Sequence, residues 1–540
     1  CTSNAMEYAI AVIDIGMTNK KAAVYDDALR QLDAKYRSFE SKIVGRKPVH
    51  DLDAMEEWFT GALKEFAAKY PIRAVVVSTH GATFVCLGED GKPALPCLYY
   101  THEPGDDFYD RFYRRFGSPE ALQERTGTPA FRAMINPAKG IFFARERFPG
   151  EFNKVTAVLP YPQYWGFRFT GNMGMENTCM GNHTYLWDQV DNTLSSVARD
   201  LGITRLIPGG AEGKPDPAGP QNGGLSNSWD VLGTITDEFA RKTGLTKDTI
   251  VTMGIHDSNS ALLPHFAKKG ERGFVLNSTG TWCVIMNPVE KYGFAPNELG
   301  KIVFFNISAF GTPVKTAIFL GGQEFETWSK LIAAHHGRKD FPGWDESLYR
   351  SILAEKRLFL LPELTPGSGQ FPASKARIVE DGRTFLFDGI KNAVDSGGAA
   401  FLPSCFTDYR TAMAILRISL VMQTLTALER SGLEKGREVY TEGGFRRDES
   451  YNRLLSSALS DNRNFLTDIA EATTLGAAMT AKMALGGKAL NELAGDFEIE
   501  YREQEKSDIP ELFSYREVWL TEAEKRIFPC RKAEYQTLLE

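Results

Sequence analysis

The chain has 540 residues and a formal net charge of −7, and this mildly acidic balance disfavours a nucleic-acid-binding protein, which usually has a basic surface. Its composition is that of an ordinary globular protein, and its length predicts two domains rather than one core. The seven cysteines form no Cys-x-x-Cys pair, which disfavours a disulfide framework or a zinc site and indicates a reducing, cytoplasmic compartment.

Two further features limit the classes of protein. No apolar run approaches the roughly 18 residues that cross a bilayer, so we expect no membrane partner. No signal peptide is evident, and the five residues before Met6 have the character of an expression scar, so the fold prediction starts at Met6.

The first half has the pattern of a mixed α/β domain. Apolar runs at 8–13 and 22–25, joined by a polar turn with a glycine, predict a β-hairpin. Apolar residues at helical spacing between 55 and 67 predict an amphipathic helix, and the runs at 74–77 and 250–253 predict buried strands. A Gly/Pro/Asn-rich stretch at 208–227 predicts a long surface loop.

The second half repeats this plan. Apolar runs at 273–276 and 282–286 flank another small polar turn, and a buried helix at 412–428, a strand at 439–441 and helices at 448–459 and 470–485 follow. The sequence therefore predicts an α/β fold with domains at 6–264 and 272–490. A charged tail at 491–540 is expected on the surface, outside the core.

The turn of the first hairpin offers groups that can hold phosphate. Backbone N–H groups and the side chains of Thr18 and Asn19 can donate hydrogen bonds, Lys21 adds positive charge, and Asp14 can hold Mg²⁺. The same residues are equally compatible with a polar hairpin whose side chains only satisfy the turn backbone.

Two later segments are similarly ambiguous. Gly280-Thr281 offers the same donors as the first turn and, with it, can flank one nucleotide, although alone it suits an ordinary turn. Gly443-Gly444 lies between a strand and a helix, where missing Cβ atoms let a flat ring approach, but a lone glycine pair is usually structural.

Candidate reactive groups stand at two strand ends. Asp257 follows the strand at 250–253 near the domain junction, where a carboxylate can take a proton from a hydroxyl group, but it can also cap the next helix. His80-Gly81 ends the strand at 74–77, and the histidine is as compatible with a structural role as with a ligand contact.

In chain order, these segments resemble the motifs of the FGGY carbohydrate kinases, members of the actin-like ATPase superfamily, over roughly residues 8–487. A single match is weak, whereas the ordered set is specific. The matching segments are Asp14-x-Gly16-x-Thr18 with Lys21, Ser78-x-His80-Gly81-Ala82, Phe169-Thr170-Gly171, Gly254-x-x-Asp257, Ser278-x-Gly280-Thr281, Glu442-Gly443-Gly444 and Glu471-Ala472-x-x-x-Gly476-Ala477-Ala478.

The resemblance implies two domains with ribonuclease-H-like cores, ATP in the cleft between them, and transfer of the γ-phosphoryl group to a sugar hydroxyl. It implies Asp257 as the base and Mg²⁺ near Asp14 and Asp257. The sugar contacts it implies are His80, Gly81, Gln163 and Asp257. The ATP contacts it implies are Thr18, Asn19, Lys21, Gly280, Thr281, Gly443, Gly444 and Asp448. The expected partners are ATP and a small sugar, with a homodimer possible.

The sugar side departs from the family pattern. The stretch 100–104 lacks the Trp-x-Asp-x-Arg pattern of many members, and Gln163-Tyr164 replaces their Asp-Tyr. Thr281-Trp282 and residues 176–184 are closest to rhamnulokinase-like and fuculokinase-like members, which favours a ketose such as a 6-deoxyketohexose, L-rhamnulose or L-fuculose. The alternatives are an ATPase of the same superfamily that phosphorylates no sugar, and a sugar-binding regulator derived from a kinase.

Overall fold

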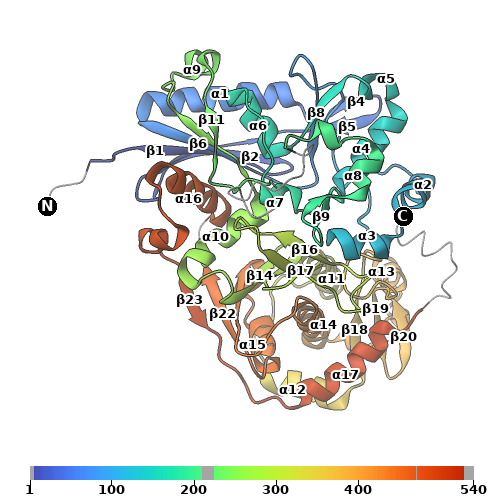
Figure 1. Ribbon diagram of the computed structural model, residues 1–540. Coiled ribbons are helices and arrows are strands. Elements are labelled where there is room, and N and C mark those ends of the chain that lie inside the picture. Colours follow the sequence, from blue (N-terminus) through green and yellow to red (C-terminus); the bar gives the residue numbers. More distant parts are fainter. Residues whose placement is uncertain (1–4, 210–223, 470, 528–540) are drawn as a thin grey trace.

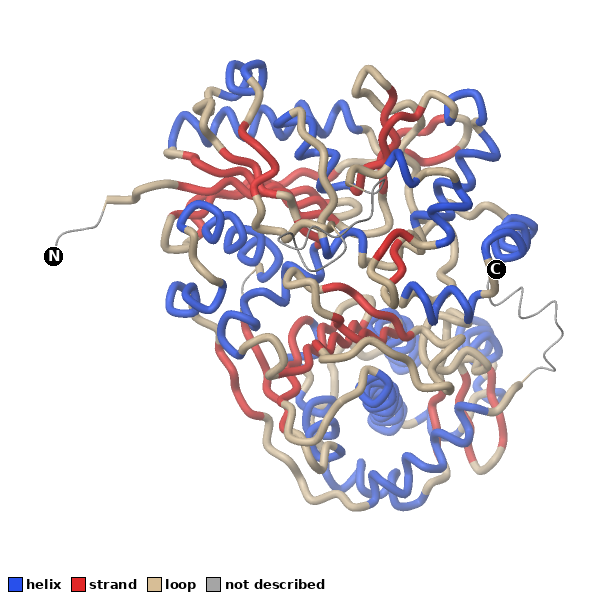
Figure 2. The backbone as a smooth tube through the Cα atoms, viewed as in Figure 1, coloured by secondary structure: helices blue, strands red, loops and turns tan. Residues whose placement is uncertain are grey.

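The computed structural model describes residues 5–209, 224–469 and 471–527 (Figure 1). Most of the loop predicted at 208–227 therefore lies outside the described residues. The described chain forms two halves, each built on a mixed seven-stranded sheet with helices on both faces (Figure 2). The predicted α/β fold class is confirmed.

The first sheet is centred on β1 (Ala9–Ile15). This strand pairs antiparallel with β2 (Asn19–Asp26) and parallel with β6 (Ile72–Thr79), which confirms the predicted hairpin and buried strand. The sheet order is β11-β12-β6-β1-β2-β3, and the further members are β3 (Gln31–Ser38), β11 (Val231–Thr234), β12 (Ile250–Thr252) and the short β13 (Ile255–His256), which pairs with β6.

The second sheet repeats the central pattern. β14 (Phe274–Thr279) pairs antiparallel with β15 (Cys283–Pro288) and parallel with β21 (Glu438–Gly443), so the predicted second hairpin is also present. The sheet order is β16-β17-β15-β14-β21-β22-β23, completed by β16 (Val303–Ile307), β17 (Pro313–Phe319), β22 (Arg463–Asp468) and β23 (Glu500–Glu503).

Helices complete the layers. On the outer face of the first sheet a hydrophobic core forms with α1 (Leu52–Lys69), α6 (Tyr161–Thr170) and α9 (Asp237–Thr243). The outer core of the second half includes α11 (Gly321–His336), α12 (Glu346–Glu355), α13 (Phe387–Ser396), α14 (Tyr409–Arg430), α15 (Glu449–Ala458), α17 (Glu511–Glu524) and the small sheet of β18 (Leu358–Leu361), β19 (Arg377–Glu380) and β20 (Arg383–Leu386).

An insertion after β6 forms a helical lobe on one side of the first half (Figure 1). Its helices are α2 (Asp106–Phe116), α3 (Pro119–Thr126), α4 (Pro137–Arg147), α5 (Pro149–Phe152), α7 (Asn177–Met180) and α8 (Ser196–Leu201). Short antiparallel pairs accompany them: β4 (Lys42–Val44) with β5 (Lys47–Val49), β7 (Phe84–Gly88) with β8 (Val155–Pro160), and β9 (Trp187–Asp188) with β10 (Thr193–Leu194).

Helices α10 (Asp257–Lys269) and α16 (Ala472–Gly486) lie between the two sheets (Figure 1) and share one core with both of them. A Cβ atom at Gly476 of α16 would lie 2.0 Å from the carbonyl oxygen of Ser260 on α10. Only glycine therefore allows the two helices to approach this closely. Pro264 lies inside α10, so the boundary predicted at 264–272 falls within this helix and the loop after it.

Helix α14 is long and apolar enough to cross a membrane. This corrects the expectation that no apolar segment of the chain approaches that length. However, 94% of its most apolar window is buried inside the protein, as predicted for the helix at 412–428. Its apolar residues surround the whole helix because it lies in the middle of the second core.

The expectation that residues 491–540 stay outside the core is wrong for the described part. β23 extends the second sheet, and α17 buries Leu512, Tyr515, Trp519 and Ala523 in the second core. The Trp519 indole Nε1–H donates to the Leu360 carbonyl at 3.1 Å, and the Tyr515 hydroxyl donates to the Leu358 carbonyl at 2.6 Å. None of the charged residues of α17 is buried in this core.

We expect Trp519→Ala to lower the free energy of unfolding by about 3–5 kcal/mol, because it opens a cavity and leaves the Leu360 carbonyl without its donor. Phe513→Ala is the matched control, since Phe513 is 50% exposed on the same helix. Urea unfolding followed by fluorescence and circular dichroism measures both changes. Equal, small losses in the two variants would contradict the buried position of α17.

Candidate active site

Three predicted site residues meet where parallel strands of the first sheet end. β1 and β13 both run parallel to β6, one on each side of it. Thr79 at the end of β6 pairs with Ile15 of β1 on one side and with His256 of β13 on the other. Asp14 in β1, His80 after β6 and Asp257 after β13 therefore lie at one sheet edge, and the His80 N–H donates to the Ile15 carbonyl at 2.9 Å. Ligand sites of open α/β sheets form at this edge.

Asp257 is the first residue of α10, and its local contacts hold one carboxylate oxygen. Oδ1 accepts from the Ser258 N–H at 2.6 Å and lies 3.2 Å from His256 Nε2. Burial raises the pKa of Asp257 from 3.8 to about 6, and the Ser258 hydrogen bonds oppose this shift. Oδ2 of Asp257 makes no hydrogen bond to the described residues. Asp257 can therefore cap the helix with Oδ1 and accept a proton on Oδ2, so the two functions considered from the sequence are compatible.

Asp14 lies close enough to Asp257 for the two charges to interact. Burial, followed by repulsion from Asp257, raises the pKa of Asp14 from 3.8 to about 7, while Lys21 opposes the shift. Two carboxylates that disfavour each other's charge suit a hard divalent cation such as Mg²⁺, which relieves the repulsion. The donor set therefore fits the predicted metal. No group of three or more His, Cys, Asp or Glu side chains that can hold a metal is found within residues 5–209, 224–469 and 471–527.

Sequence reasoning missed the support behind Asp257. His256 Nδ1 accepts from the Asn259 amide at 2.9 Å, which leaves the proton on Nε2, facing Asp257. The His256 N–H donates to the Thr178 hydroxyl, which donates to the fully buried Glu176 at 2.7 Å. Glu176 and His256 lie in segments that the sequence analysis singled out, but no local pattern reveals that Thr178 links them.

The first predicted phosphate turn is open to solvent. Thr18 and Asn19 are exposed, and the Gly16 N–H closes the turn by donating to the Asn19 carbonyl at 3.0 Å. The Ser38 hydroxyl donates to the Asn19 side chain at 2.7 Å. Lys20, which the sequence did not single out, is fully buried and donates to the Met17 carbonyl at 2.7 Å, so it fixes the turn from behind.

Lys21 lies at the predicted place but is already paired. Its ammonium group forms an ion pair with Glu471 and donates to Gln31 at 2.8 Å, and the Tyr36 hydroxyl donates to the same glutamate at 2.8 Å. Glu471 directly precedes α16, so this contact joins the first hairpin to the second half of the chain. The Lys21 charge is thus compensated from within the protein.

The second predicted phosphate turn, with Gly280 and Thr281 exposed, lies against the start of α11. A Cβ atom at Gly322 would lie 2.0 Å from the Gly280 carbonyl oxygen, and the Gln323 N–H donates to the Thr281 carbonyl at 3.3 Å. No side chain caps this helix start. Its N–H groups and positive dipole end therefore favour an anion beside the turn, a contribution that sequence reasoning did not identify.

Gly443 lies directly beside this second turn. It has a φ of 86°, and a Cβ atom there would lie 2.0 Å from the Thr279 carbonyl oxygen. The Thr279 hydroxyl donates to the Glu442 carbonyl at 2.5 Å and accepts from the Phe445 N–H at 2.9 Å. Gly443-Gly444 thus adjoins the Gly280 turn through the parallel pairing of β14 and β21, and this close strand approach requires the glycine.

Both carboxylate oxygens of Asp448 are held within the protein. Oδ1 accepts from the Tyr451 N–H at 2.9 Å as the N-cap of α15, and Oδ2 accepts from Arg417 at 3.0 Å. The first of these contacts is helix capping, which the residue's position before a helix also predicts. A contact between Asp448 and ATP stays a prediction.

On the sugar side, His80 and Gly81 line a small cavity together with His256 and Asn182. Burial lowers the pKa of His80 to about 4, so the ring is neutral; Nδ1 lies 2.8 Å from the Gly81 carbonyl, and Nε2 has no partner among the described residues. Gln163 does not reach this cavity. It is fully buried, and its amide donates to the Met253 carbonyl at 2.6 Å, so it supports the segment before Asp257 instead.

The comparisons identify the second half of the chain. Residues 271–489 match the family model of the carbohydrate kinase FGGY C-terminal domain. This part of the chain belongs to the FGGY carbohydrate kinases. No curated protein sequence matches the chain.

Solved structures extend the likeness in fold to almost the whole chain. A carbohydrate kinase from Novosphingobium aromaticivorans matches with a TM-score of 0.75 at 24% identity, over 96% of this chain and 99% of its own. A xylulose kinase from Lactobacillus acidophilus gives 0.74 at 15% identity, over 96% and 97% of the two chains. A glycerol kinase from Plasmodium falciparum, solved with ADP, gives 0.72 at 14% identity, over 97% and 99%. The predicted two-domain actin-like ATPase fold is thus confirmed.

A buried histidine connects helix α10, which begins at Asp257, to the FGGY C-terminal domain. His265 of α10 is fully buried, with Nε2 3.1 Å from Glu442 Oε2 and Nδ1 3.0 Å from the Tyr501 hydroxyl. Glu442 directly precedes Gly443, and Asp257 begins the same helix that carries His265. Sequence reasoning had no signal for this contact, because the three residues are far apart along the chain.

We expect His265→Ala to raise the KM for ATP about five- to tenfold and to change kcat less, because it releases Glu442 beside the Gly443 turn. Steady-state kinetics measures this split. The control is His335→Ala on α11 of the FGGY C-terminal domain, because the His335 side chain makes no hydrogen bond to the described residues. A fall in kcat alone, with unchanged KM for ATP, would contradict this positioning effect.

The raised pKa values of Asp14 and Asp257 predict a pH dependence of stability. The folded protein retains protons on these carboxyl groups that the unfolded chain has already lost, so without metal the free energy of unfolding falls as pH rises from about 4 to 7. Asp14→Asn removes the contribution of Asp14 to this fall. Compared with the unmodified protein, the variant should therefore lose less free energy of unfolding between pH 4.5 and pH 7.5, by an amount on the order of 1 kcal/mol.

Urea unfolding in EDTA at both pH values tests this expectation. The exposed Asp200→Asn serves as control for the loss of one negative charge. If the two variants show the same pH dependence, Asp14 has no raised pKa in the folded protein.

Proposed function

We propose that the protein transfers the γ-phosphoryl group of ATP to a hydroxyl group of a small, uncharged sugar. The observation that carries this proposal is the meeting of Asp14, His80 and Asp257 at one sheet edge of a chain whose second half is an FGGY kinase domain. Phosphoryl transfer needs a base and positive or N–H groups for the phosphates, and the candidate site offers both.

In the proposed reaction Asp257 takes the proton of the attacking sugar hydroxyl. The sugar oxygen forms a bond to the γ-phosphorus while the bond from that phosphorus to the bridging oxygen of ADP breaks, and ADP leaves with that electron pair. Ser258 and His256 hold Oδ1, which leaves Oδ2 to accept the proton. A pKa raised to about 6 by burial strengthens the carboxylate as a base near neutral pH.

The charge on the phosphates would be met by groups from both halves of the chain. Thr18 and Asn19 are exposed at the first turn, and the N-terminus of α11 lies at the second turn beside Thr281. Lys21 would reach phosphate only by leaving Glu471. Mg²⁺ held by Asp14 and Asp257 would neutralise charge on the phosphate oxygens.

The uncharged side chains around the small cavity at His80 and His256 support a neutral sugar at the neighbouring Asp257; the cavity itself, at about 10 Å³, holds no sugar. Among the described residues that line it, none is Lys, Arg, Asp or Glu, and burial lowers the pKa of His80 to about 4 and that of His256 to about 3. A sugar acid would lack a cation for its carboxylate there. Within neutral sugars we favour a ketose, and a 6-deoxyketohexose such as L-rhamnulose or L-fuculose, on the resemblance of Thr281-Trp282 and residues 176–184.

We expect Asp257→Asn to lower kcat by about 10³-fold or more while ATP affinity changes less than about threefold, because the amide cannot take a proton but keeps the shape of the side chain. A coupled ADP-release assay and calorimetric titration of ATP measure the two quantities. Asp248→Asn, an exposed site before β12, is the control. Near-normal turnover by Asp257→Asn would overturn its assignment as the base.

A substrate screen tests the proposed acceptor. We expect ADP release with Mg²⁺ and ATP to rise at least about tenfold over the sugar-free rate for a neutral ketose, and no rise for aldonates. Mass spectrometry of the product locates the new phosphate. Equal ATP hydrolysis with and without every sugar would favour the ATPase alternative, and sugar binding without any phosphorylated product would favour the regulator.

A further inference from the structure

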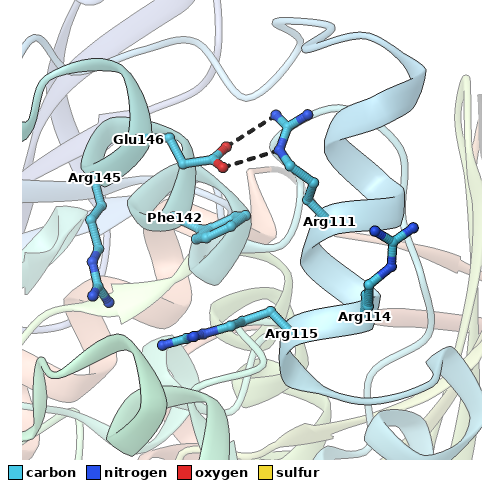
Figure 3. A pocket seen from close by; sticks show the side chains of 6 residues that line it. All are labelled: Arg111, Arg114, Arg115, Phe142, Arg145 and Glu146. Carbon is cyan, nitrogen blue, oxygen red and sulfur yellow. Dashed lines mark hydrogen bonds and ion pairs between the residues drawn. The ribbon is translucent and has the colours of Figure 1, made fainter.

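A groove lined by four arginines lies on the helical lobe of the first half, formed by other residues than the candidate active site (Figure 3). It has a volume of about 560 Å³, and the residues that line it are Arg111, Arg114, Arg115, Phe142, Arg145 and Glu146. Helix α2 supplies the first three residues and helix α4 supplies the others. The lining therefore carries four positive charges and one negative charge in a chain whose net charge is −7.

One ion pair fixes the width of this arginine groove. Arg111 on α2 donates twice to Glu146 on α4, from Nε at 3.0 Å and from Nη2 at 3.1 Å. This two-point contact uses the groove's single carboxylate and holds the two helices together. The remaining three guanidinium groups have no acidic partner within the described part of the chain.

Two of these guanidinium groups, from different helices, line the same groove. Figure 3 shows the Arg115 side chain extending past the Phe142 ring toward the side of the groove on which Arg145 lies. Arg145 is held in place because its Nη1 donates to the Leu201 carbonyl at the end of α8, at 3.1 Å. Two like charges that approach without a carboxylate between them repel each other, and a bound anion would remove this repulsion.

A simpler explanation accounts for only part of the cluster. Arg114 and Arg115 lie in the last turn of α2, and Arg145 lies in the last turn of α4, where positive charge stabilises a helix. That effect does not require that arginines of two different helices line one groove. It also gives no reason for the partly exposed ring of Phe142, which lines the groove and whose centroid lies 5.2 Å from that of Phe116.

We propose that the arginine groove binds a phosphorylated small molecule, with its phosphate between Arg115 and Arg145 and its organic part against Phe142. Guanidinium groups match phosphate oxygens through paired hydrogen bonds, and an aromatic ring offers a flat surface to a sugar or base. The volume suits a single small ligand. The phosphorylated sugar formed in the proposed reaction and a nucleotide share this chemistry. The binding itself does not depend on the proposed function.

Isothermal titration of the whole protein with four probes distinguishes the sources. Fructose 6-phosphate represents phosphorylated sugars, AMP represents nucleotides, inorganic phosphate lacks the organic part, and fructose lacks the phosphate. We expect the favoured phosphate ester to bind at least about tenfold more tightly than inorganic phosphate, and fructose to give no groove-dependent signal. Equal affinity for the esters and inorganic phosphate would overturn the assigned contact with Phe142.

Variants locate the binding. Arg115→Met with Arg145→Met should weaken the phosphate ester at least about tenfold, whereas Arg241→Met, an exposed arginine of α9, should have no effect. Asp257→Asn should also leave this binding unchanged, which separates it from the active site and from the fate of the proposed reaction. Unchanged affinity in the double variant, or equal weakening in Arg241→Met, would overturn the proposal.

A variant with the opposite expected effect excludes misfolding as the cause. Glu146→Gln removes the groove's negative charge and frees Arg111, so it should strengthen binding about threefold. Loss of fold cannot produce tighter binding. Weaker binding in Glu146→Gln, with unchanged circular dichroism, would show that negative charge is not excluded from this site and would count against the proposal.

Discussion

The close contact between α10 and α16 is the constraint on which the rest of the molecule depends. Gly476 lets α16 approach the Ser260 carbonyl to a distance that any side chain would prevent. Each of these helices begins at a group of the candidate site: α10 begins at Asp257, and Glu471, the partner of Lys21, precedes α16. A shift of one helix against the other would therefore change the distance between Asp257, the proposed base, and Lys21 in the first hairpin.

Burial determines the chemistry of the candidate site more than charge pairing does. Desolvation is the largest cause of the raised pKa values of Asp14 and Asp257 and of the lowered pKa of His80. The same low-dielectric surroundings that raise the pKa of Asp257 keep the nearby imidazoles uncharged. The nearby ammonium groups already have partners within the protein, because Lys21 is paired with Glu471 and Lys20 donates to the Met17 carbonyl.

Much of the fold could be predicted from the sequence because its signals are local. The hairpin turns at Gly16 and Gly280, the buried strands and the Ala-rich helix before Gly487 follow from short apolar runs ended by small polar residues. The meeting of Asp14, His80 and Asp257 followed from the family order of motifs, and parallel pairing of β1, β6 and β13 explains it.

What could not be predicted depends on contacts between distant segments. The resemblance implies ligand contacts for Asp448 and Gln163, but Asp448 caps α15 and the Gln163 amide group donates to the Met253 carbonyl. Glu176 supports the distant His256 through Thr178, and His265 contacts the distant Glu442. Composition gave no warning that a charged tail would supply Trp519 to a core. In each case the side chain's use is decided by what packs against it.

The position of α17 has a consequence for the order in which the protein can form during synthesis. Tyr515 and Trp519 close the second core against β18, which lies more than 150 residues earlier in the chain. The first half can bury its sheet as soon as its own strands and α1 have left the ribosome, but the second core stays open until α17 follows. The second core is therefore completed last, and part of its apolar surface stays exposed until α17 has been synthesised.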